Sequence, residues 1–139
     1  FLNFPKKAGS MTKLFSKDRA NKYFGKGMVV FFAGGTGHPY FSTDTATVLR
    51  AIEIEAEGIL LAKAIDGIYD SDPKLNPDAK KYDEISIQEM IDKRLLAVDL
   101  TASIMCLENK MPMLVFGLNE ENSIVETMTG TFTGTKVTV

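Results

Sequence analysis

A run of glycine and hydroxyl residues separates an apolar segment from an amphipathic one in the first half of the chain. The stretch reads FFAGGTGHPYFSTDTATVLRAIEIEA over residues 31–56. Its glycines let backbone N–H groups approach an anion closely, and Ser42 and Thr43 add hydroxyl donors. The following helix would favour a phosphate at its start, with Thr43 or Asp44 as its cap. The turn therefore predicts a phosphate-binding site, and a turn shaped by packing alone is the open alternative.

Two common phosphate-binding motifs do not fit this turn. A Walker A loop needs Lys followed by Ser or Thr after its last glycine, and the segment GGTGHPYF contains no Lys. The dinucleotide fingerprint needs a third glycine three residues after the second, but Gly37 is followed by His38, Pro39 and Tyr40. The turn is therefore of another kind.

The elements around the turn alternate as they do in an α/β protein. The continuous apolar run 28–33 predicts a strand covered on both faces, helical spacing predicts a helix over 46–56, and GILLA predicts a buried strand over 58–62. Together they predict a β-α-β unit with a right-handed crossover. Residues 65–85 predict a long ordered excursion, which in a compact domain is usually functional. Further helices are predicted over 17–24, over 99–110 with Asp99 at the N-cap, and over 120–130, and another helix is predicted to start at Ser86. Further strands are predicted over 111–118 and 133–139.

Composition excludes several classes of function. The formal net charge is −2, so no basic excess indicates nucleic acid as a partner. The longest apolar run, 28–33, is too short to span a bilayer. Cys106 is the single cysteine, which rules out an internal disulfide and fits a reducing, cytoplasmic setting. Residues 1–10 are interpreted as a cloning-derived junction or an irregular native arm, and 11–139 as one part of a domain.

Three longer stretches together resemble one family. FAGGTGHPYFSTDTA, IDGIYDSDPKLNPDAKKYDEIS and VDLTAS follow the order and spacing of the bacterial uridylate (UMP) kinases of the amino acid kinase family. The similarity runs from about residue 19 through PMLVFGLNEENSIVETMTG into TGTKVTV. DGIYDSDP is shared more widely among amino acid kinases, whereas GTGHPYFSTD points to the uridylate branch. The resemblance implies a three-layer αβα sandwich with a mainly parallel sheet.

The resemblance also implies that part of the enzyme is missing. Members of this family carry an N-terminal half that opens with a lysine-containing, glycine-rich phosphate loop, and no K-x-S-G pattern occurs in this chain. We therefore expect residues 11–139 to be the C-terminal, nucleotide-binding part of such a kinase. The reaction implied is transfer of a phosphoryl group from ATP to UMP, giving UDP and ADP in pyrimidine nucleotide biosynthesis. We expect this chain alone to be inactive.

Site residues carry over position by position. The family's acceptor stretch matches residues that would bind UMP: Thr36, Gly37, His38, Pro39, Tyr40, Phe41, Ser42 and Thr43. His38 stands where the family usually has Asn, and an imidazole lacks the paired donor and acceptor of an amide. The family's ATP contacts match Lys63, Tyr69 and Asp72. Two alternatives stay open for Lys63: an alignment shifted by one position, and an ion pair with Asp66.

Two acidic residues match the family's catalytic positions. Asp44 and Asp99 would orient a hydrated Mg²⁺ between the nucleotides, or would only cap helices. No metal ligand is assigned beyond this. The cluster DPKLNPDAKKYDE is interpreted as a solvated surface. A homo-oligomer is expected, because intact family members are hexameric. Self-association through an exposed sheet edge is expected too.

Two other functions remain open. One is a different amino acid kinase that acts on a carboxylate or carbamate. The other is a non-catalytic nucleotide-binding or assembly module, which the absence of a phosphate-loop lysine favours for this chain. GTGHPYFSTD fits a nucleotide acceptor better than a small carboxylate.

Overall fold

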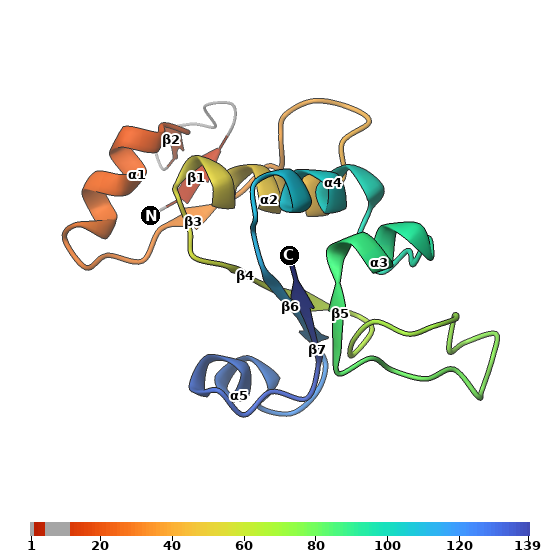
Figure 1. The fold of residues 1–139 in the computed structure, drawn as a ribbon. Coiled ribbons are helices and arrows are strands. Elements are labelled where there is room, and N and C mark those ends of the chain that lie inside the picture. The colour runs from red at the N-terminus through yellow and green to blue at the C-terminus, as the bar shows by residue number, and fades with distance from the viewer. Residues whose placement is uncertain (1, 5–11) are drawn as a thin grey trace. The chain divides into compact units, whose positions relative to one another are not determined.

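The chain forms two compact units, residues 1–56 and 57–139 (Figure 1). The computed structural model describes residues 2–4 and 12–139. The boundary between the units falls inside the segment 11–139 that the sequence analysis treats as one part of a domain. Of the N-terminal segment 1–10, only residues 2–4 are described, and they form a strand rather than an irregular arm. Three residues are too few to produce a detectable sequence period, and their partners lie elsewhere in the chain.

The N-terminal unit contains a small parallel sheet and two helices. Its elements are β1 (Leu2–Phe4), β2 (Lys13–Leu14), α1 (Lys17–Phe24), β3 (Phe31–Phe32) and α2 (Thr43–Glu53). The strand order is β2-β1-β3, and β1 pairs in parallel with both neighbours. α1 has the bounds predicted for it. It starts at Ser16, whose hydroxyl accepts a hydrogen bond from the amide of Arg19 at 3.4 Å, and it ends at Gly25.

The buried strand predicted over 28–33 is wrong in length and in burial. The strand β3 comprises Phe31 and Phe32, and Val29 and Phe31 are 73% and 60% exposed. The apolar run indicates a propensity for strand, but the number of residues that pair also depends on the partner strand. The β-α-β unit is not formed within one sheet either, because β3 pairs with β1 whereas the next strand joins the second sheet. Strand pairing depends on distant residues that local periodicity does not contain.

The C-terminal unit holds a four-stranded, mainly parallel sheet. Its elements are β4 (Ile59–Lys63), β5 (Glu84–Ser86), α3 (Ile87–Asp92), α4 (Leu100–Glu108), β6 (Met113–Gly117), α5 (Ser123–Thr129) and β7 (Thr135–Thr138). The strand order is β4-β6-β7-β5. β4 pairs in parallel with β6 and β5 with β7, whereas β6 and β7 are antiparallel. β5 lies at the end of the predicted excursion, where its three residues were not recognised as a strand.

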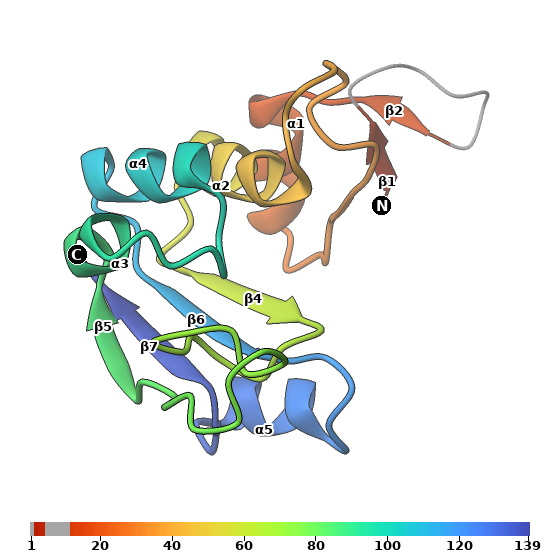
Figure 2. The same cartoon turned by 90° about the vertical axis from the view of Figure 1, so that its right-hand side faces the viewer.

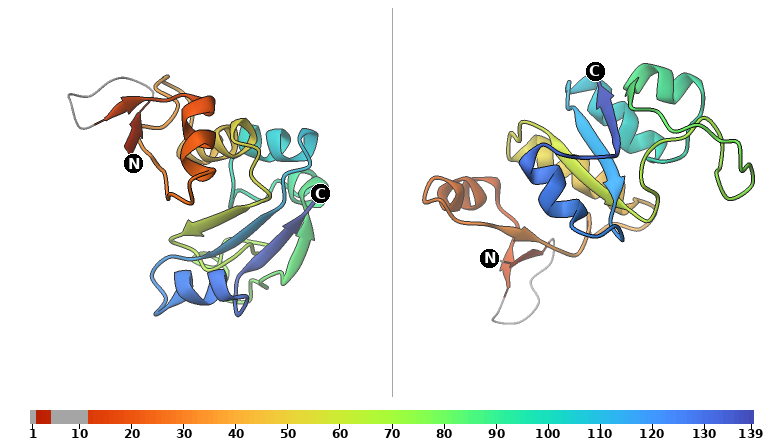
Figure 3. Two further views of the ribbon diagram at one scale, coloured as in Figure 1. Left: turned by 90° about the vertical axis from the view of Figure 1, so that its left-hand side faces the viewer. Right: turned by 90° about the horizontal axis from the view of Figure 1, so that it is seen from below.

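Three layers make up this unit, as the sequence resemblance implies. α4 lies on one face of the sheet with α3 beside it, and α5 lies on the other face (Figures 2 and 3). The core between the layers contains Ile68, Ile87, Met90, Val115 and Val137, each at most 1% exposed. Burial of these side chains is the main stabilising contribution.

The helices α3 and α4 both begin at their predicted N-cap residues. The Ser86 hydroxyl accepts from the amide of Glu89 at 3.1 Å, and the Asp99 carboxylate accepts from the amide of Ala102 at 3.0 Å. Among the described residues, no helix combines the length and the apolar character needed to cross a membrane.

Candidate functional site

The glycine-rich turn of the N-terminal unit is folded tightly around one threonine. The Thr36 hydroxyl accepts a hydrogen bond from the amide of His38 at 3.1 Å and donates to the carbonyl oxygen of His38 at 3.2 Å. Gly37, between them, has φ +75°, a backbone conformation that a side chain disfavours. Glycine at position 37 therefore suits the path of this turn.

Tyr40 combines full exposure with an unusual backbone. Its φ is +71°, in the left-handed region, and its side chain is as exposed as in an extended chain. Phe41 beside it is 54% exposed. A non-glycine residue in this region costs about 1 kcal/mol, so the backbone strain is not offset by burial of the ring. Two exposed aromatic rings beside a glycine turn can provide walls for a planar ligand.

The residue that caps α2 is Ser42, not Thr43 or Asp44 as predicted. Its hydroxyl accepts from the amide of Thr45 at 3.0 Å. The helix begins three residues earlier than the apolar spacing indicated, so Thr43 and Asp44 are its first two residues. Thr43 is exposed and Asp44 is half-buried. A carboxylate in a first turn stabilises the helix through its dipole, which gives Asp44 a structural role besides any chemical one.

In the C-terminal unit, Lys63 lies at the carboxyl-terminal edge of the sheet. The parallel strands β4 and β6 both end there, with Lys63 paired in register with Gly117. The amide of Leu118 donates to the carbonyl oxygen of Lys63 at 2.7 Å, which continues the pairing beyond β6. β7 starts at this edge, because Val115 pairs with Thr135 in the antiparallel ladder. Open α/β sheets bind ligands beyond the carboxyl ends of their strands.

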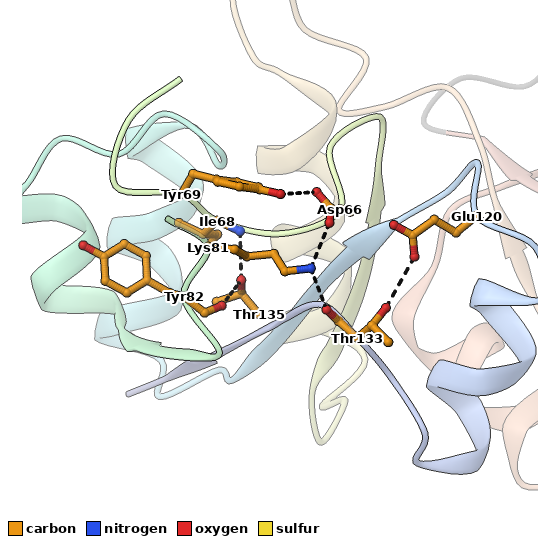
Figure 4. Close-up of polar contacts among 8 residues, drawn as sticks. All are labelled: Asp66, Ile68, Tyr69, Lys81, Tyr82, Glu120, Thr133 and Thr135. Atoms are coloured by element: carbon orange, nitrogen blue, oxygen red, sulfur yellow. Dashed lines mark hydrogen bonds and ion pairs between the residues drawn. The ribbon is translucent and has the colours of Figure 1, made fainter. Parts of the chain in front are cut away.

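Between β4 and β5, the part of the predicted excursion that precedes β5 is joined to this edge by a network of polar side chains (Figure 4). The Tyr69 hydroxyl donates to Asp66 Oδ1 at 2.8 Å, and Lys81 Nζ contacts Asp66 Oδ2 at 2.8 Å. Lys81 Nζ also donates to the carbonyl oxygen of Thr133 at 3.0 Å. Residues 69 and 81 form an isolated antiparallel bridge. The excursion is therefore ordered, as predicted, but Lys81 belongs to this network rather than to a solvated surface.

The charges in the network are mutually stabilised. Burial alone would raise the pKa of Asp66, but the hydrogen bonds from Lys81 and Tyr69 outweigh burial and hold this pKa below its ordinary value. The hydrogen bond to Asp66 raises the pKa of Lys81, and a hydrogen bond to the same carboxylate raises the pKa of the Tyr69 phenol. At neutral pH the carboxylate and the ammonium are both charged and the phenol is neutral.

The other two predicted acidic residues have local partners. Asp72 is exposed, and its carboxylate accepts from the amide of Lys74 at 2.9 Å, as in an Asx turn. Asp99 caps α4 through the Ala102 amide. Both contacts are structural, and neither excludes a second role for the remaining carboxylate lone pairs.

Comparison with known proteins places the chain in a family. The family model described as "Amino acid kinase family" matches residues 4–117, well over half of the chain. The chain belongs to the amino acid kinase family. The matched span includes the glycine-rich turn, the excursion and β4 to β6, which are the parts that carry the candidate residues.

Solved structures of two bacterial UMP kinases resemble this amino acid kinase over 99% of its length. The enzyme from Ureaplasma parvum is 35% identical with a TM-score of 0.91, and that from Bacillus anthracis is 28% identical with a TM-score of 0.91. A uridylate kinase from Archaeoglobus fulgidus is 29% identical over 86% of the chain with a TM-score of 0.69. This chain spans only 59%, 57% and 56% of those three proteins respectively.

The described residues offer no dense protein cage for a divalent cation. Within residues 2–4 and 12–139, no group of three or more His, Cys, Asp or Glu side chains is arranged to hold a metal ion. Mg²⁺ usually keeps several waters and binds one or two carboxylates together with substrate phosphates. A single half-buried carboxylate such as Asp44 or Asp99 fits that mode of binding.

Sequence reasoning missed several polar residues at this edge of the sheet. Lys81 was assigned to the surface, and Glu120, Thr133 and Thr135 were not singled out. Thr135 is fully buried, and its hydroxyl accepts from the amide of Ile68 at 2.8 Å and donates to the carbonyl oxygen of Tyr82 at 2.6 Å. The available signal was weak: in TKVT, Thr135 shares the alternate positions of Val137, which indicates an inward-facing hydroxyl that needs partners.

Proposed function

We propose that this chain is the nucleotide-binding part of a UMP kinase that transfers the γ-phosphoryl group of ATP to UMP and releases UDP and ADP. The observation that carries the proposal is the match to the Ureaplasma parvum UMP kinase, at 35% identity over 99% of this chain. The proposal extends the family membership to a particular acceptor. Pyrimidine nucleotide synthesis, a cytoplasmic location and homo-oligomeric assembly belong to the same proposal.

The acceptor side of the proposed site is the turn 36–43. Its glycines allow N–H groups to approach a phosphate, and Thr43 at the first position of α2 adds an exposed hydroxyl next to the positive end of the helix dipole. Tyr40 and Phe41 supply aromatic surface for a pyrimidine or ribose. His38 would contribute one ring donor where the family pattern has an amide.

The donor side of the proposed site is the sheet edge of the C-terminal unit. Lys63 ends β4 and would face a phosphate, since a lysine ammonium is a compact point charge suited to that contact. The half-buried ring of Tyr69 would pack against adenine. Asp72, exposed in its turn, would accept from a ribose hydroxyl.

Phosphoryl transfer depends on positioning and on neutralising charge at the moving group. In this proposal Asp44 and Asp99 are the catalytic carboxylates. Each is considered in its own unit, and each would bind hydrated Mg²⁺ beside a nucleotide phosphate, where the ion would neutralise phosphate charge. The chain has no K-x-S-G loop to place a lysine at the transferred group. A single preorganised donor is often worth about 10²–10³ in rate, so this chain alone should turn over far more slowly than an intact kinase.

A non-catalytic nucleotide-binding module is the second candidate. The lack of a K-x-S-G phosphate-loop lysine in this chain is the feature that favours it. Both candidates bind nucleotide, whereas a kinase for a carboxylate or carbamate would not bind UMP.

Ligand titration with an activity control tests the proposal. UMP, glutamate, aspartate and carbamate are titrated separately into the purified chain by calorimetry, and UDP formation from ATP–Mg²⁺ and UMP is followed by phosphorus NMR. We expect heat from UMP alone and no detectable UDP. Binding of a carboxylate instead of UMP would contradict the proposed acceptor, and rapid turnover would contradict the expected inactivity.

A further inference from the structure

We propose that Asp66 and Lys81 form a clasp whose role is to position the ring of Tyr69 for the purine base of the phosphoryl donor. The inference rests on the proposed function, because it assigns positioning residues to the donor side of that site. Neither residue is expected to touch the nucleotide. The clasp is here defined as Asp66, Lys81 and the carbonyl oxygen of Thr133, which Figure 4 shows together with Tyr69.

Both carboxylate oxygens of Asp66 are used inside the protein. Oδ1 accepts from the Tyr69 hydroxyl at 2.8 Å, and Oδ2 contacts Lys81 Nζ at 2.8 Å. One carboxylate therefore links two points of the excursion that are twelve positions apart in sequence. The side chains of Lys81 and Asp66 are only 27% and 33% exposed, so water screens their charges less than it screens a fully exposed ion pair.

Lys81 carries this link to a second segment. Its ammonium donates to the carbonyl oxygen of Thr133 at 3.0 Å, just before β7. The Thr133 hydroxyl contacts Glu120 at 3.4 Å, in the segment after β6. The ammonium thus ties the excursion to the connection between the two central strands. A neutral side chain at position 81 would leave both acceptors without this donor.

Close packing at Gly67 leaves the clasp little freedom to rearrange. A Cβ atom there would lie 2.8 Å from Lys81 Cδ and 2.8 Å from Thr135 Oγ1. The stem of Lys81 therefore lies directly on the backbone between Asp66 and Ile68. Ile68 is fixed by its own bond to Thr135, so the backbone on which Tyr69 sits is held on both sides.

These contacts determine what Tyr69 can offer a ligand. Its hydroxyl already donates to Asp66, so the phenol contributes its ring face rather than a hydrogen-bond donor. A ring held by its hydroxyl and by its backbone loses little further rotational freedom on binding a base. Preorganisation of this kind raises affinity without adding contacts.

The test compares Lys81→Met and Lys81→Arg with a matched control, Lys136→Met. Lys136 pairs with Glu84 at 3.1 Å between neighbouring strands of the same sheet, but both side chains are more than half exposed. ATP–Mg²⁺ and UMP affinities are measured by calorimetry on the whole chain. Amide exchange is measured at Tyr82, whose N–H donates to Ile68 at 2.9 Å.

We expect Lys81→Met to weaken ATP–Mg²⁺ binding about tenfold, the usual weight of a charge-assisted hydrogen bond, with UMP affinity unchanged. Tyr82 exchange should accelerate about tenfold. Lys81→Arg should restore both properties, and Lys136→Met should change neither. The clasp is overturned if Lys81→Met leaves Tyr82 exchange unchanged, or if Lys136→Met weakens ATP–Mg²⁺ binding equally. A wild-type chain that binds no ATP–Mg²⁺ would contradict the proposed function. The clasp would still be tested in that case, by the amide exchange rate of Tyr82 in Lys81→Met relative to wild type.

Discussion

The hydroxyl of Ser42 accepts a hydrogen bond from the amide of Thr45 and so fixes where α2 begins. The neighbouring hydroxyls of Ser42 and Thr43 therefore have different roles. Ser42 stabilises the helix, whereas the side chain of Thr43 is exposed at the first helical position. The turn 36–41 leads directly into this cap, so the backbone N–H groups of the first helical turn follow the proposed acceptor residues in the chain.

Ser42→Ala and Thr43→Ala should therefore have opposite signatures. Loss of the cap should lower the free energy of unfolding by about 1 kcal/mol. Thr43→Ala should leave that free energy within about 0.5 kcal/mol of wild type but weaken UMP binding. Urea denaturation and calorimetric titration measure the two quantities. If Thr43→Ala destabilised the fold as much as Ser42→Ala, the assignment of the cap would be wrong.

Gly134 should tolerate no side chain. A methyl group there would overlap the carbonyl oxygen of Val115 on β6, which is backbone and cannot swing away. Gly134→Ala should lower the free energy of unfolding by about 3 kcal/mol or more. The comparison variant is Gly130→Ala, where φ is +89° but the space is open, so only the backbone strain of about 1 kcal/mol applies. Equal losses for the two variants would contradict the packing described for Gly134.

Acid should weaken the C-terminal unit through Asp66. Its pKa in the folded protein lies below the ordinary carboxyl value of about 4, so its contribution is present above that pH and is lost as pH falls through the folded pKa. Lys81 and Tyr69 face this carboxylate, and the Glu120 charge also acts on both. Lys81 has the opposite pH dependence. Its pKa is raised in the folded protein, so its contribution to the free energy of unfolding is present below about pH 10 and is lost in stronger alkali.

Because the Asp66–Lys81 pair is about one-third exposed, its contribution is expected to be about 1 kcal/mol after screening. The free energy of unfolding of wild type and Asp66→Asn should differ at pH 6 and converge towards pH 3. A difference that stayed constant over this range would show that the charge of Asp66 does not contribute.

Cys106 should be inert in the folded chain. It is fully buried in α4, and burial raises the pKa of its thiol to about 11. At pH 8 its reaction with a thiol reagent should be at least about 100-fold slower than in the unfolded chain, because the thiolate is the reactive form. Stopped-flow labelling in buffer and in denaturant measures both rates. Fast labelling in buffer would indicate that α4 opens readily.

The local elements of this protein could be predicted from sequence because their signals are local. Ser86 and Asp99 cap the helices predicted to start at them, and α1 has its predicted bounds. Strand partners could not be predicted in the same way. The run 28–33 looks like a buried strand by composition, but the partner of Phe31 is Leu2, in a segment with no strand pattern of its own.

The candidate site could be predicted only as a set of positions. Tyr69 was singled out by resemblance to the family, but its partner Asp66 was matched with Lys63 rather than Lys81. The correct cation lies fifteen residues beyond Asp66, across a bridge that no periodicity reveals. The cap of α2 was displaced for a different reason, because Ser42, Thr43 and Asp44 are all good cap residues and composition alone does not choose among them.

Calorimetric titration of the purified chain with ATP–Mg²⁺ and then with UMP tests the central claim most directly. Tyr69→Ala and Thr43→Ala are the paired variants, each serving as the control for the other. The account predicts that the wild-type chain binds both nucleotides, that Tyr69→Ala loses ATP–Mg²⁺ but keeps UMP, and that Thr43→Ala does the reverse. A chain shown to be folded by circular dichroism that binds neither nucleotide would contradict it.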